Sequence, residues 1–69
     1  MNQDTEIVIW GIPPNEDLET LLYTLAESKE EAERIAEKLE KYHGCTKTRV
    51  QVFSGYLKPD FADKRLLNI

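Results

Sequence analysis

Residues 28–44, SKEEAERIAEKLEKYHG, decide the fold because they carry the signals of one complete helix. Ser28 is expected to be the N-cap, and Glu31 follows three residues later, so the two can form a capping box. Gly44 is suited to end the helix in the left-handed conformation. Apolar residues recur between them at steps of three, one, three and three, which places them on one helical face. These residues are Ala32, Ile35, Ala36, Leu39 and Tyr42.

Two strands are predicted before this helix. Residues 5–12 (TEIVIWGI) are β-branched and aromatic, and two prolines follow them. This strand is apolar on both faces, so we expect the helix to cover one face and the C-terminal tail or another molecule to cover the other. Residues 19–25 (ETLLYTL) are predicted to form a second, antiparallel strand. A helix over residues 18–26 is the competing interpretation because the leucines also have helical spacing, but the threonines and the tyrosine favour a strand.

A third strand is predicted after the helix. Residues 46–53 (TKTRVQVF) alternate in polarity, so one face is expected to meet the helix and the other to meet solvent. Residues 66–69 can add a short edge strand at the C-terminal end. The chain is therefore expected to be a single α+β domain over residues 1–69. It would have a small antiparallel or mixed sheet in ββαβ order, with one amphipathic helix packed on one face.

Composition limits the possible environments and partners. The chain has 69 residues, one cysteine and a net charge of −4. It shows no signal peptide and no apolar run of the length that a membrane span needs, so a reducing, cytoplasmic location is expected. Residues 1–27 carry six acidic residues and no Lys or Arg, whereas residues 43–69 carry five basic and two acidic residues. These two parts either face different partners or pair with each other across the sheet.

The sequence gives no sign of a catalytic or metal centre. The single histidine, His43, and the single cysteine, Cys45, are two residues apart, whereas a structural zinc site needs four protein ligands. We expect His43 to interact with the helix C-terminus and Cys45 to be a small buried residue. No glycine-rich phosphate loop is present. The chain is therefore expected to be a non-enzymatic protein without a cofactor.

Binding to another molecule is the remaining class of function. The outer face of the third strand carries Lys47, Arg49 and Phe53, and Trp10 can lie beside them, a combination that suits single-stranded nucleic acid. An isoelectric point of about 4.9 disfavours phosphates as the primary partner, so this stays the alternative. Trp10 is either part of the core or an interface anchor. A third hypothesis for the function is a homodimer in which the second copy covers Val8 and Trp10.

The order of motifs resembles that of small proteins encoded by phages and mobile elements. The matching pieces are Trp10-Gly11-Ile12-Pro13, Ser28 with Glu31, Tyr42-His43-Gly44, Arg49-Val50 and Pro59-Asp60-Phe61. More narrowly, the helix is similar to that of one type I-F anti-CRISPR family. The shared pattern is Ala32-x-Arg34-Ile35-Ala36-x-Lys38, then Tyr42-His43-Gly44 and a strand that carries Arg49.

This resemblance implies a phage-type inhibitor that binds a host ribonucleoprotein, the CRISPR effector, where guide RNA meets target DNA. Arg34 and Lys38 match basic positions of that family, whereas Glu33 stands where the family has a base. We therefore expect an inhibitor of a host defence machine that acts by protein–protein contact in the host cytoplasm. The expected contact residues are Glu16, Asp17, Glu19, Arg34, Lys38 and Arg49, with Trp10 as an interface anchor.

Overall fold

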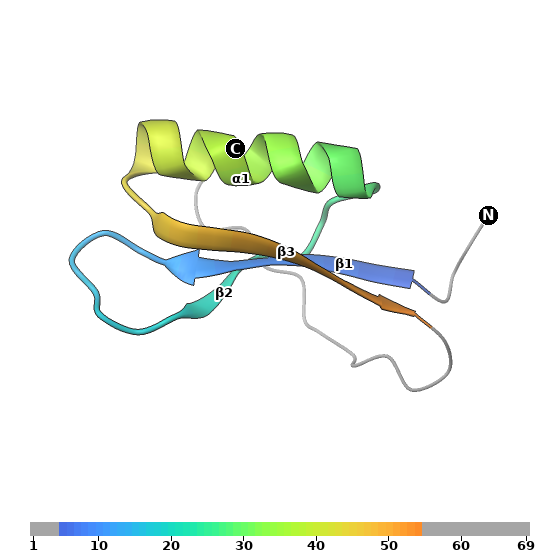
Figure 1. Ribbon diagram of the computed structural model, residues 1–69, viewed down its shortest axis with the longest axis horizontal. Coiled ribbons are helices and arrows are strands. Elements are labelled where there is room, and N and C mark those ends of the chain that lie inside the picture. Colours follow the sequence, from blue (N-terminus) through green and yellow to red (C-terminus); the bar gives the residue numbers. More distant parts are fainter. Residues whose placement is uncertain (1–4, 55–69) are drawn as a thin grey trace.

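The computed structural model describes residues 5–54, which form a three-stranded sheet with one helix across one face (Figure 1). The elements are β1 (Thr5–Ile12), β2 (Thr20–Tyr23), α1 (Lys29–His43) and β3 (Thr46–Ser54). The strand order is β2-β1-β3, and both pairings are antiparallel. The predicted α+β class and ββαβ order are confirmed, and the sheet is antiparallel. The predicted C-terminal edge strand lies outside the described residues.

The bounds of α1 follow from its two caps. The Ser28 hydroxyl accepts a hydrogen bond from the N–H of Glu31 at 3.0 Å, as a capping box requires. The Glu31 carboxylate accepts a hydrogen bond from the N–H of Glu27 at 2.6 Å. In the usual capping box the donor is the N-cap residue itself, which here would be Ser28. At the other end Gly44 has a φ of 76°, the left-handed conformation that was predicted.

The core lies between α1 and the sheet. Four of the five predicted apolar helix residues are buried in it: Ala32, Ile35, Ala36 and Leu39. The prediction for the fifth, Tyr42, is wrong, because its side chain is 67% exposed. The chain reverses at Gly44 and brings Cys45, which is 2% exposed, into the core cluster. Cys45 therefore fills the end of the core, and Tyr42 projects beyond it with the Lys41 ammonium over its ring.

β2 is a strand, as predicted, but it is shorter than the predicted residues 19–25. Its last pair toward the turn joins Thr20 to Gly11. One residue further, Ile12 is the last residue of β1, and Pro13 and Pro14, which have no N–H to donate, follow it, so β1 offers little more strand for pairing. At the other end the chain leaves the sheet after Tyr23 to reach the start of α1.

The centre of β1 is buried on both faces, as its continuous hydrophobicity predicted. Ile9 lies on the helix side in the core cluster, and Val8 points to the opposite face by the alternation of a strand. Both side chains have an exposed fraction of 0%. The predicted cover for the second face, the C-terminal tail or another molecule, lies outside the described residues.

A bulge in β3 lies opposite Gly11. Trp10 pairs with Arg49, but Ile12 pairs with Thr46, so two residues of β3 oppose Gly11 alone. Lys47, the first of the two, has a φ of 54°. A Cβ atom on Gly11 would lie 2.7 Å from Leu22 Cδ1 and 3.0 Å from the methyl group of the second bulge residue, Thr48. The absence of a side chain at Gly11 therefore allows β2 and β3 to approach β1 closely here.

Candidate functional site

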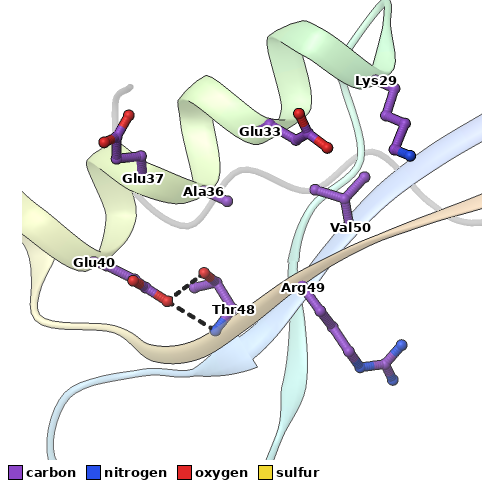
Figure 2. A pocket seen from close by; sticks show the side chains of 8 residues that line it. All are labelled: Lys29, Glu33, Ala36, Glu37, Glu40, Thr48, Arg49 and Val50. Atoms are coloured by element: carbon purple, nitrogen blue, oxygen red, sulfur yellow. Dashed lines mark hydrogen bonds between the residues drawn. The ribbon is translucent and has the colours of Figure 1, made fainter.

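An open groove of about 520 Å³ runs between α1 and β3 (Figure 2). Its walls come from the side of the helix that overhangs β3 and from β3 itself. The lining residues are Lys29, Glu33, Ala36, Glu37, Glu40, Thr48, Arg49 and Val50. Figure 2 shows the Arg49 side chain pointing away from the helix, so this residue contributes only its backbone side to the groove.

The helix wall of the groove is acidic. Glu33, Glu37 and Glu40 follow one another at steps of four and three residues, which places them on one flank of α1. All three are exposed. The basic side chain in this wall is Lys29, at the first residue of the helix. We call the three glutamates the acidic flank.

Glu40 joins the helix to β3. One of its carboxylate oxygens accepts hydrogen bonds from the backbone N–H of Thr48, at 3.1 Å, and from the Thr48 hydroxyl. The two hydrogen bonds from Thr48 hold the pKa of Glu40 below its ordinary value. Glu40 therefore carries a negative charge at neutral pH. Its contact with Thr48 closes one end of the groove.

β3 is an edge strand within residues 5–54, because the sheet order ends with it. The N–H of Thr48 points away from β1, since it donates to Glu40. Successive residues of a strand alternate in direction, so Val50 and Val52 turn their N–H and C=O groups toward the same edge. Val52 is 46% exposed. The groove therefore borders a strand edge that can accept another strand.

The opposite face of the sheet holds two of the predicted contact residues, but they bind each other. The Arg49 guanidinium donates to both carboxylate oxygens of Glu19, at 2.9 and 3.0 Å. This pairing lowers the pKa of Glu19 and raises that of Arg49. Arg49 also lies 5.5 Å from the ring centroid of Trp10, whose indole N–H donates to the Gln51 side chain at 2.8 Å. The interpretation that acidic and basic parts pair across the sheet thus holds for Glu19 and Arg49.

The other four predicted contact residues lie elsewhere. Glu16 and Asp17 are exposed in the loop between β1 and β2. Arg34 and Lys38 are exposed on α1, where they line a second hollow of about 210 Å³ with Glu37, Lys41 and Tyr42. The six residues therefore occupy a loop, the outer helix surface and the outer sheet face, and they do not form one surface.

The groove itself was not predicted. One signal of it exists in the sequence, since Glu33, Glu37 and Glu40 share one flank of the helix. Their position over the edge of β3, however, depends on where the helix lies across the sheet, and sequence periodicity does not report that position.

The residues of the nucleic-acid alternative are partly engaged. Arg49 is paired with Glu19, Phe53 is half-buried, and Lys47 is exposed in the bulge. Trp10 is half-buried beside Arg49 on the outer face and is not part of the core cluster, and its role as an interface anchor stays a prediction.

The described part of the chain shows neither an exposed thiol nor a metal-ligand cluster. Cys45 is buried, as predicted, and this burial raises the pKa of its thiol, so the sulfur stays protonated at neutral pH. Residues 5–54 contain no cluster of three or more His, Cys, Asp or Glu side chains suited to a metal ion. Within the same residues, α1 is too short and too polar to cross a membrane.

Comparisons with protein-family models, curated proteins and solved structures found no match for this chain.

Proposed function

We propose that this chain is a non-catalytic binding protein that recognises another protein through the groove between α1 and β3. The observation that carries the proposal is the edge of β3, which no strand of residues 5–54 covers, beside the acidic flank of the helix. A strand edge offers a row of backbone donors and acceptors, which is a common means of protein–protein contact. The acidic flank adds a charge preference to that contact.

Two observations support this proposal over the competing classes. The buried, protonated thiol of Cys45 is a poor nucleophile, which argues against cysteine catalysis. A groove with Glu33, Glu37 and Glu40 on one wall repels phosphates, and the Glu19 carboxylate neutralises Arg49 on the outer sheet face. A nucleic-acid partner therefore finds little attraction on either surface.

Inhibition of a host defence machine in the cytoplasm is the more specific form of this proposal. It rests on the resemblance of the helix to a type I-F anti-CRISPR family, with Arg34 and Lys38 as the matching bases. These two residues line the hollow on the outer surface of α1, and Glu37 of the acidic flank lines both this hollow and the groove. A target that uses both surfaces would therefore contact α1 on either side of Glu37.

A matched pair of charge reversals tests the proposal. The groove variant is Glu33→Lys with Glu37→Lys, and the control, with the same change in charge, is Glu16→Lys with Asp17→Lys in the β1–β2 loop. Each protein would be tagged and used to capture partners from nuclease-treated host lysate, with identification by mass spectrometry. We expect a specific protein to be captured by the wild type and the loop variant, and lost from the groove variant.

Circular dichroism would check that both variants keep the helix. Loss of the partner from the loop variant, with retention by the groove variant, would overturn the proposal and assign binding to Glu16 and Asp17. Capture from untreated lysate that is lost from the nuclease-treated lysate would point to a nucleic-acid partner instead.

A further inference from the structure

We infer that the groove binds an extended, basic segment of a partner protein, which pairs with β3 as a fourth strand of the sheet. This inference rests on the proposed function and names the class of segment that the groove would take. It follows from three features of the groove: an edge of β3 that is open within residues 5–54, the spacing of its charges and its closed end.

The open edge sets the backbone conformation of the ligand. Val50 and Val52 turn their N–H and C=O groups away from β1, so a chain that satisfies them must itself be extended. An added strand would lie about 4.8 Å from β3, the spacing of neighbouring strands in a sheet. Val50 and Ala36 form an apolar floor on the helix side of this edge.

The acidic flank sets the side chains of the ligand. Alternate residues of a strand point to the same face and are separated by about 6.6 Å. Residues four apart on a helix are separated by a rise of about 6 Å. Figure 1 shows α1 lying along the strands, so Glu33 and Glu37 repeat at nearly the spacing of alternate strand residues. Lysine or arginine at every second position would therefore place one cation near each carboxylate.

The closed end sets where pairing starts. Glu40 already accepts the hydrogen bond that the N–H of Thr48 would give to an added strand. A fourth strand can therefore pair with β3 from Val50 onward and not across the bulge at Lys47. The site is short, which is typical of strand addition to the edge of a small domain.

Charge also favours a basic segment over a second copy of the same chain as the occupant of the groove. Two copies joined edge to edge through β3 would be related by a two-fold axis, so each surface would meet itself. With the helices on one face of the joined sheet, the two acidic flanks would lie toward each other and repel. A basic segment meets the same flank with attraction.

A peptide probe tests the inference. The probe is a fluorescein-labelled peptide of seven residues with lysine at its second, fourth and sixth positions and valine or threonine elsewhere. Its control has glutamate in place of lysine. We expect the lysine peptide to bind at low salt with at least tenfold higher affinity than the glutamate peptide, measured by fluorescence anisotropy.

A variant of β3 separates strand pairing from simple charge attraction. Val52→Pro removes an N–H on the open edge, where proline is tolerated in edge strands, and leaves the pairing with β1 in place. We expect Val52→Pro to weaken binding of the lysine peptide at least tenfold, while Val52→Thr binds as the wild type does. Amide exchange followed by NMR should show the N–H groups of Val50 and Val52 protected when the peptide is bound.

Three results would overturn the inference. Equal binding of the lysine peptide to Val52→Pro would reduce the contact to charge alone, and failure of both peptides to bind would exclude an extended basic ligand. A dimer mass for the wild type without peptide, lost in Val52→Pro, would make a second copy the occupant. If the groove variant loses its captured partner while the peptide fails, the proposed function stands and only this inference fails.

Discussion

Gly11 is a residue at which β1 leaves no room for a side chain on the helix side. A methyl group there would meet a Leu22 side chain that is fully buried and a Thr48 side chain that Glu40 holds in place. Neither neighbour can move away without disturbing the core or the groove. The bulge of β3 lies opposite Gly11, and the N–H of Thr48 in this bulge points to Glu40 on the helix.

We predict that Gly11→Ala lowers the free energy of unfolding by about 1–3 kcal/mol, the usual cost of overpacking a close contact. Urea denaturation of the wild type and the variant would measure this. Thr46→Ala, at an exposed residue of the same sheet, is the control and should change stability by less than about 0.5 kcal/mol. An unchanged midpoint for Gly11→Ala would mean that β2 and β3 can separate at no cost.

Single residues also show where sequence reasoning succeeds. The burial of Cys45 was predictable because a free cysteine behaves as a small apolar residue and is usually buried. The exposure of Tyr42 was not, because helical spacing alone does not reveal that the chain reverses two residues later and that Cys45 takes the last place in the core. The partnership of Glu19 with Arg49 depends on how the segment before β2 lies relative to β3, which no pattern in the sequence reports.

At the scale of elements, both ends of α1 were predictable because the signals that start and end a helix are local. Ser28, Glu31 and Gly44 act within one turn of the residues that they cap. β2 was predictable in type but not in length, because its pairing stops where its partner β1 ends, just before Pro13 and Pro14, and its own residues do not show this. The groove depends on packing between elements, which no local signal encodes.

We predict that Ser28→Ala destabilises the protein by about 1 kcal/mol, since it removes the oxygen that accepts the N–H of Glu31. Thermal denaturation followed by circular dichroism would measure the loss. Lys38→Ala, on the outer surface of the same helix, is the matched control and should leave the midpoint nearly unchanged. A midpoint for Ser28→Ala equal to that of the control would show that the cap contributes nothing to the folded state.

At the scale of the whole molecule, two carboxylates tie separate elements together. Glu40 joins α1 to β3, and Glu19 joins the segment before β2 to β3. Both have a pKa below the ordinary value of 4.5, because each accepts hydrogen bonds that favour the charged form. Their contribution to stability is therefore complete above pH 4.5 and is lost as the pH falls through the lowered pKa.

We predict that acidification from pH 7 to pH 3 destabilises the wild type more than it destabilises Glu40→Gln or Glu19→Gln, since glutamine has no proton to gain. Urea denaturation at both pH values would measure the difference. Glu30→Gln, on the outer side of the helix, should behave as the wild type does. An equal loss in all four proteins would assign the acid sensitivity to other carboxylates.

Trp10 has a consequence for the spectroscopy of this molecule. It is the single tryptophan of the sequence, so it accounts for the whole of the long-wavelength ultraviolet fluorescence. Its indole is half-buried, hydrogen-bonded to Gln51 and covered by Arg49, so it joins β1 to β3 on the face away from the groove. Its emission therefore reports the integrity of the sheet without a label, and a peptide in the groove can alter that emission only through the strands themselves.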